Sequence, residues 1–204
     1  MSKYNPKIHH RRSIRLKGYD YSQSGLYFII ICCQDRRCRF GKVVNGEMIL
    51  SDFGKIAYNE WAALQERFPN FDLDVFQIMP NHMHGIIVIT HNMARTDGPN
   101  IPHIPVREPL AVCQNIQNGE ILAVSPTCDD TSNLITVGAI VGAYKSIVNN
   151  KCLDLCKAQN TKMGKLWQRN YYEHIIRNER AYSNISKYIL ENPIKWDGDK
   201  FYRQ

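Results

Sequence analysis

Two histidines separated by one methionine form the most distinctive chemical pattern in the chain. His82 and His84 follow a Met-Pro-Asn turn and lead into the apolar run of residues 85–89. Alternate residues of a β-strand face the same way, so the two imidazoles would project from one surface about 7 Å apart. This spacing suits two ligands of one divalent metal ion, although it also fits two histidines on a half-exposed strand.

A tyrosine and a carboxamide near the C-terminus are spaced by one helical turn. Tyr188 and Asn192 would share one face of a helix that Pro193 must stop. Two imidazoles and one amide oxygen leave coordination positions open for water and substrate, which is typical of a catalytic metal site. Nitrogen and amide-oxygen ligands favour Mg²⁺ or Mn²⁺ engaged with a phosphate over Zn²⁺.

A tyrosine beside such a metal could act as a nucleophile. The phenol of Tyr188 is weak at neutral pH because its ordinary pKa is near 10, but a metal that polarises a phosphate lowers the demand on it. The product would be a covalent phosphotyrosine that conserves the bond for a later rejoining step. Tyr144 is the main rival, although its i+4 neighbour, Val148, is not an amide.

The charge distribution indicates a polyanionic partner. The chain carries a net charge of +7, and the basic residues are concentrated in residues 1–42 and 144–204, around an acidic middle segment. This pattern favours nucleic acid held by one side of the molecule. The candidate phosphate contacts are Arg11, Arg12, Arg15, Arg36, Arg37, Arg39 and Lys145.

The composition predicts a globular, reduced protein. The 204 residues, 44% of them hydrophobic, are enough for one domain with a real core. The seven cysteines include no Cys-x-x-Cys pair, and the N-terminus is polar and basic without a secretory signal. No apolar run reaches the length of a membrane span. We therefore expect a cytoplasmic protein with free thiols.

Periodicity predicts the elements that would position these residues. A continuous apolar run at 26–33 reads as a central strand, and 71–79 alternates as a strand that turns into the next one. Further strands are expected at 47–50, 84–90 and 167–176. Helices are expected from Ser51 or Asp52 to Arg67, over 134–157, and after an Asn178 cap.

This order predicts an α+β, ferredoxin-like plan: an antiparallel sheet with helices on one face and an extra C-terminal helix. The histidines would lie on a central strand within reach of that last helix. Residues 1–24 are expected to form a basic arm, and the proline-punctuated residues 91–133 a surface insertion in a single domain covering residues 1–204.

These motifs resemble a known family. The run from Met79 to His84 is similar to the histidine–hydrophobic–histidine signature of the HUH single-strand DNA endonucleases. Residues 167–179 and 188–193 resemble the C-terminal block of REP-associated tyrosine transposases, within the IS200-like single-tyrosine group. The resemblance covers roughly residues 15–90 and 134–196.

The resemblance implies an activity. The protein would cleave single-stranded DNA beside a small hairpin, with Tyr188 attached to the 5′ phosphate and a free 3′ hydroxyl released. It also implies that His82, His84 and Asn192 hold the divalent metal, Mg²⁺ or Mn²⁺. A monomer or weak homodimer is expected.

Two other functions remain open from the sequence. The first is a non-catalytic sheet that binds single-stranded or hairpin nucleic acid through basic and aromatic side chains, which would not need the four site residues together. The second is a zinc hydrolase that uses the two histidines, but it lacks a clear third strong ligand.

Overall fold

A computed structural model describes residues 18–68, 71–90 and 135–202, which belong to one compact unit. The expected surface insertion at 91–133 lies outside the described residues. The expected basic arm lies outside them up to Lys17, and its last residues, 18–24, form turns that lead into the first strand.

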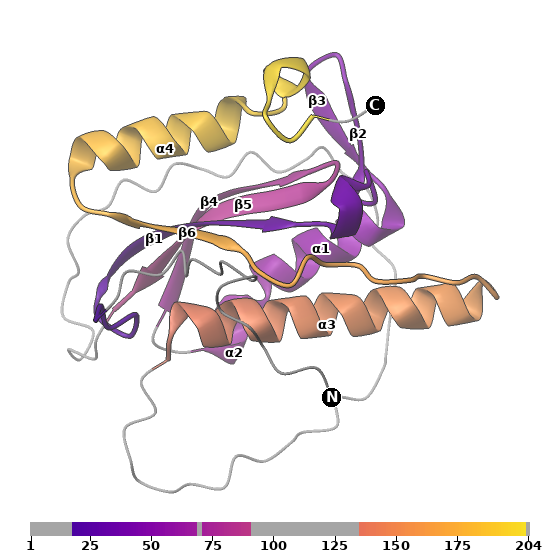
Figure 1. The fold of residues 1–204 in the computed structure, drawn as a ribbon, viewed down its shortest axis with the longest axis horizontal. Helices are drawn as coiled ribbons and strands as arrows, with labels where there is room; N and C mark the ends of the chain where they lie inside the picture. The colour runs from indigo at the N-terminus through magenta and orange to yellow at the C-terminus, as the bar shows by residue number, and fades with distance from the viewer. Residues whose placement is uncertain (1–17, 69–70, 91–134, 203–204) are drawn as a thin grey trace, which may run out of the picture. The chain divides into compact units, whose positions relative to one another are not determined.

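An antiparallel sheet forms the centre of this unit (Figure 1). Its strands are β1 (Gly25–Cys32), β4 (Phe71–Met79), β5 (His82–Ile89) and β6 (Tyr172–Ile176), in the order β4-β5-β1-β6. The apolar run of β1 is central because it pairs with β5 on one side and β6 on the other. The predicted α+β, ferredoxin-like plan is confirmed.

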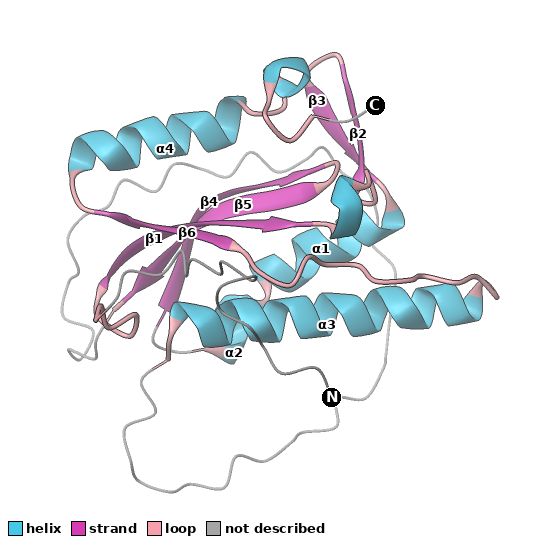
Figure 2. Ribbon diagram, in the orientation of Figure 1, coloured by secondary structure: helices cyan, strands magenta, loops and turns pink. Residues whose placement is uncertain are grey.

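Helices cover both faces of the sheet (Figure 2). The first face is covered by α1 (Asp52–Ala62), the short α2 (Leu64–Arg67) and α3 (Val137–Ala158), and the other face by α4 (Glu179–Glu191). The two expected helices therefore lie together on one face, and the extra C-terminal helix lies on the opposite one. The segment after α4 ends in a 3₁₀ turn, η2 (Trp196–Gly198), and residues 196 and 201 join the α4-side core.

The strand pleat divides the side chains of β5 between two cores. Met83, Ile87 and Ile89 pack on the α1 and α3 side, whereas Ile86 packs on the α4 side. His82 and His84 share the orientation of Ile86. The sequence predicted that both histidines would lie on one face of the sheet, within reach of the last helix. The structure places them on that face.

Two elements are broken where the sequence predicted continuity, and one strand with the predicted bounds, 47–50, has a partner that was not predicted. The helix predicted to reach Arg67 is divided at Ala63. The short strand β3 (Glu47–Leu50) pairs with β2 (Gly41–Val44) in a separate hairpin rather than with the main sheet. The strand expected at 167–176 is interrupted: Trp167 forms an isolated antiparallel bridge with Cys33, and the regular strand β6 begins at Tyr172. Between them, the Lys145 ammonium donates to the carbonyls of Gln168 and Arg169.

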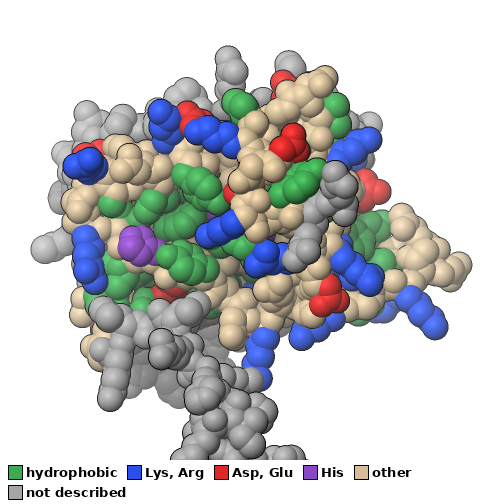
Figure 3. Space-filling model, turned by 45° about the horizontal axis from the view of Figure 1, so that its top comes forward, with side chains coloured by type: hydrophobic (Ala, Val, Ile, Leu, Met, Phe, Trp, Pro, Cys, Tyr) green, Lys and Arg blue, Asp and Glu red, His purple; other side chains and the backbone are tan. Residues whose placement is uncertain are grey.

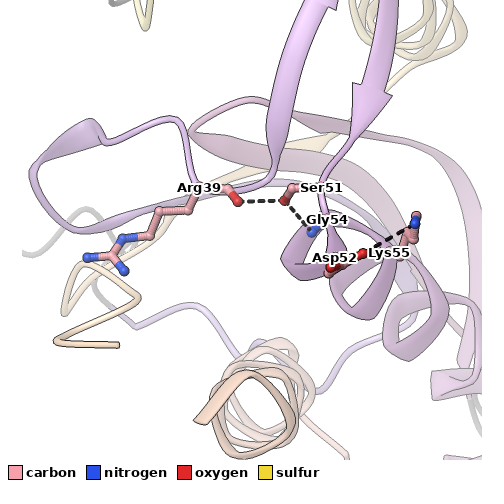
Figure 4. A network of polar contacts seen from close by, with 5 residues as sticks. All are labelled: Arg39, Ser51, Asp52, Gly54 and Lys55. Carbon is pink, nitrogen blue, oxygen red and sulfur yellow. Dashed lines mark hydrogen bonds and ion pairs between the residues drawn. The ribbon is translucent and has the colours of Figure 1, made fainter. Parts of the chain in front are cut away.

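Two predicted helix caps are confirmed. Asn178 caps α4 by accepting a hydrogen bond from Ala181 N at 2.8 Å. Ser51, not Asp52, caps α1: its hydroxyl accepts from Gly54 N at 3.2 Å and donates to the Arg39 carbonyl at 2.7 Å (Figure 4). Gly54 leaves no room for a side chain, since a Cβ there would lie 2.1 Å from the Phe40 carbonyl oxygen. Among the described helices, none is both long and apolar enough to cross a membrane.

Candidate active site

His82 and His84 lie side by side at the start of β5. Both side chains are fully buried, and their ring centroids are 5.1 Å apart at nearly a right angle. Phe201, from the segment after α4, covers the His82 ring at a centroid distance of 4.6 Å. The pair is therefore enclosed between the sheet and the C-terminal segment.

Asn81 determines the orientation of the His82 ring. Its amide nitrogen donates to the Phe201 carbonyl at 2.7 Å and the Arg36 carbonyl at 3.2 Å, so its Oδ1 is turned toward His82 Nδ1, 2.9 Å away. Because an amide oxygen can only accept, Nδ1 must carry the proton of the neutral ring. The lone pair of His82 then lies on Nε2, which is the arrangement that metal-binding histidines use.

Burial keeps both imidazoles neutral. Loss of solvation, and then the nearby cations Lys200 and Arg36, lower the pKa of His82 to about 3. The pKa of His84 lies well below its ordinary value, mainly through burial and also through His82, with Asp199 acting in the opposite direction. A neutral imidazole has a free lone pair to offer a cation.

Helix α4 brings a phenol to the histidines, and Asp199 joins this phenol to the carboxamide that follows the helix. The Tyr188 ring lies 5.4 Å from that of His84, centroid to centroid. The Tyr188 hydroxyl donates to Asp199 Oδ2 at 3.1 Å, and Asn192 Nδ2 donates to the same oxygen at 2.8 Å. The other carboxylate oxygen of Asp199 accepts from Phe201 N at 2.6 Å. Asp199 therefore holds both side chains in place.

Four buried atoms in this cluster have no hydrogen-bond partner within the described residues: His82 Nε2, both ring nitrogens of His84, and Asn192 Oδ1. Leaving a buried polar atom unpaired costs about 1–3 kcal/mol. These atoms belong to the three residues predicted as metal ligands, and two imidazoles with one amide oxygen fit a cation that retains open positions. In the same described ranges, no group of three or more His, Cys, Asp or Glu could hold a metal ion.

Tyr188 is half-buried, and its phenol is protonated at neutral pH. Burial raises its pKa first, and the negative charge of Asp199 and its hydrogen bond raise it further. A nucleophilic Tyr188 would thus need a proton acceptor, and the Asp199 carboxylate is in hydrogen-bond contact with it.

The rival tyrosine is a core residue. Tyr144 lies on the opposite face of the sheet, fully buried against Trp61 and Trp167, and its hydroxyl donates to the Ala57 carbonyl at 3.0 Å. Its phenolic oxygen does not reach the histidine pair, so this alternative does not fit the structure.

The described candidates for phosphate contact differ in their surroundings. The Arg36 guanidinium lies over the Phe201 ring, 5.1 Å from its centroid, and Arg37 is exposed. The Arg39 side chain extends away from the α1 cap (Figure 4) and donates to the Met163 carbonyl at 2.8 Å. Lys145 donates to two backbone carbonyls. Arg39 and Lys145 therefore anchor the segment before β6, while Arg36 lies at the site. Arg11, Arg12 and Arg15 lie outside the described residues.

Sequence reasoning did not identify Asn81, Asp199, Lys200 or Phe201 as site residues. Asn81 could have been found, since it directly precedes the first histidine. Asp199, Lys200 and Phe201 belong to no recognisable motif in the sequence. They reach β5 only because the chain turns back toward the sheet after α4.

Comparison with known proteins bears on the fold. No family model matches the chain. An uncharacterized protein of Haemophilus influenzae is 40% identical over 201 residues, which is 98% of each chain. A second protein of that organism, provisionally named a REP-associated tyrosine transposase, is 21% identical over 177 residues, or 86% of this chain and 74% of that one.

A solved structure shares the fold. It is described as a REP-associated tyrosine transposase bound to a REP hairpin, and it matches with a TM-score of 0.50 and 18% identity over 98% of this chain and 77% of that one. The four-stranded antiparallel sheet and its covering helices are thus an arrangement that this chain shares with that structure. The chain is thus similar to REP-associated tyrosine transposases in fold and, at low identity, in sequence.

Proposed function

We propose that this protein is a metal-dependent single-stranded DNA endonuclease and strand transferase that acts next to DNA hairpins through a 5′-phosphotyrosine intermediate. The observation that carries the proposal is that Tyr188 lies against His84 and shares the Asp199 carboxylate with Asn192. Among the described residues, four ligand-type atoms of the two histidines and Asn192 are buried and unpaired. The hairpin substrate is suggested by the relative of similar fold, which was solved with a REP hairpin.

The chain's own residues have distinct parts in the proposed reaction. Tyr188 Oη attacks the scissile phosphorus while its proton passes to Asp199 Oδ2, to which it is already hydrogen-bonded. The bond from phosphorus to the 3′ oxygen breaks, and that oxygen takes a proton from solvent to become a free 3′ hydroxyl. The DNA 5′ end stays on Tyr188, so attack by another 3′ hydroxyl rejoins a strand.

His82, His84 and Asn192 would hold Mg²⁺ or Mn²⁺ through the unpaired atoms described above. When bound, the cation would polarise the scissile phosphate and stabilise charge on its oxygens. Asn81 fixes the His82 tautomer, and Asp199 fixes the Asn192 amide so that its oxygen, not its nitrogen, points away from the carboxylate.

The alternative is a binding protein that holds hairpin DNA without cutting it. The two functions are separated by incubating the protein with a hairpin oligonucleotide and Mn²⁺, followed by denaturing electrophoresis. A band shifted by the mass of the cleaved strand, absent with chelator, supports the transferase. Hairpin binding in a native gel without any denaturation-resistant band under either condition would contradict it and support the binder.

A further inference from the structure

The face of the sheet next to the proposed site is only partly covered. Helix α4 packs chiefly over β4 and, less, over β5. On the edge strand β6, Tyr172 therefore remains 45% exposed although its ring faces the same side. Its register partner on β1 is Ile30, a residue of the α4-side core. An exposed aromatic ring thus lies on the same surface as the histidine pair.

One ring separates Tyr172 from the proposed nucleophile. Phe28 contacts Tyr172 edge-to-face at 6.3 Å between centroids, and it contacts Tyr188 in the same way at 6.3 Å. Phe28 also lies 6.4 Å from His84. Phe28 itself is buried, so Tyr172 is the member of this aromatic series whose ring is open to a ligand.

The Lys200 ammonium lies near both the exposed Tyr172 ring and the site. Lys200 Nζ lies 5.8 Å from the Tyr172 centroid and 4.8 Å from that of Phe201, which covers His82. Arg36 lies on the same Phe201 ring. Neither cation forms an ion pair with any acidic side chain in the described part of the chain. On the face shown in Figure 3, exposed hydrophobic side chains gather with Lys and Arg side chains around them.

We propose that Tyr172 and Lys200 form a nucleotide-binding clamp for single-stranded DNA beside the scissile phosphate. The Tyr172 ring stacks on a base, and the Lys200 ammonium binds the phosphate of that nucleotide. An exposed aromatic face next to an unpaired cation matches the two parts of a nucleotide, and stacking tolerates any base. The assignment rests on the proposed function for its substrate, and its test does not require cleavage.

The test uses a hairpin oligonucleotide with a single-stranded flank that carries 2-aminopurine at successive positions, in the presence of chelator. Stacking quenches this base, so binding of the wild-type protein should quench it most at one position. Tyr172→Ala should abolish that quenching and weaken binding about tenfold, as expected for loss of one stacked base. Tyr172→Phe should retain the quenching, and Tyr172→Leu, which keeps an apolar side chain without a ring, should not. Ile194→Ala removes another exposed apolar side chain, which is 74% exposed. This control should retain both the quenching and the affinity.

Lys200→Gln should reduce the slope of log affinity against log salt by about 0.7, the value for one single-strand phosphate contact. Lys162→Gln, at an exposed lysine with the same charge change, should have no such effect. Equal quenching in Tyr172→Ala, or an unchanged salt slope in Lys200→Gln, would overturn the clamp, as would tighter binding of the matching RNA flank. A different result would contradict the proposed cleavage and leave the clamp intact. In that case position-specific quenching would persist, but no covalent product would form at any metal concentration.

Discussion

The hydroxyl of Tyr188 donates to Oδ2 of Asp199 over 3.1 Å, which joins the last turn of α4 to the segment that follows it. The same oxygen accepts from Asn192. One carboxylate thus positions the proposed nucleophile and one proposed metal ligand, and it accepts the hydrogen bond of the phenol. This relationship makes Asp199 as informative to test as the motif residues.

Asp199→Asn should slow covalent adduct formation by at least about 100-fold, the usual contribution of a general base, because the amide preserves the shape but cannot take a proton. Hairpin binding should stay within about twofold. Rates come from time courses on denaturing gels. Asp197→Asn, an exposed neighbour in η2, is the control, and equal rates in both variants would remove Asp199 from the mechanism.

His82→Ala and His84→Ala should each prevent Mn²⁺ binding, since one imidazole and one amide cannot hold a labile divalent ion. Calorimetric titration of the free protein measures this without any reaction. His174→Ala changes an exposed histidine of β6 and should bind the ion as the wild type does. Mn²⁺ binding of wild-type strength in either site variant would show that the ion, if bound, lies elsewhere.

The fold was predictable wherever one local pattern determined the structure. The apolar run of β1, the alternation of β4 and the Asn178 cap all depend on near neighbours in sequence. The histidine pair and the Tyr188–Asn192 turn were found for the same reason, since strand and helix periods fix their relative directions. Asp199 and Lys200 were missed because their contacts depend on how the chain returns after Pro193. The interruption between Trp167 and β6 was missed because the contacts of this segment, including those of the Lys145 ammonium with the carbonyls of Gln168 and Arg169, come from residues distant in sequence.

Tyr144→Phe should lower the free energy of unfolding by about 0.5–1.5 kcal/mol, the net contribution of one buried hydrogen bond, because the bond to the Ala57 carbonyl is lost. Adduct formation should be unchanged. Urea unfolding measures the first effect and denaturing electrophoresis the second. Loss of the adduct in a variant that remains folded would return Tyr144 to consideration.

Deletion of residues 1–17 should make DNA binding less sensitive to salt. This segment carries six Lys or Arg residues, and three phosphate contacts would reduce the log–log slope by roughly two units. Affinity is measured over a salt series on one hairpin oligonucleotide. An unchanged slope with unchanged affinity would place the basic surface elsewhere, in the region of Arg36 and Arg37.

The most direct test of the central claim is to identify the residue that becomes linked to DNA. Trypsin cuts after Lys187 and Lys195, releasing a peptide in which Tyr188 is the sole tyrosine. After reaction with hairpin DNA and Mn²⁺ and nuclease trimming, mass spectrometry should find a nucleotide phosphate on this peptide and none in Tyr188→Phe. Tyr182→Phe, on the same helix, should retain the modification. A modified peptide that contains another tyrosine, or an adduct of wild-type yield in Tyr188→Phe, would contradict the account.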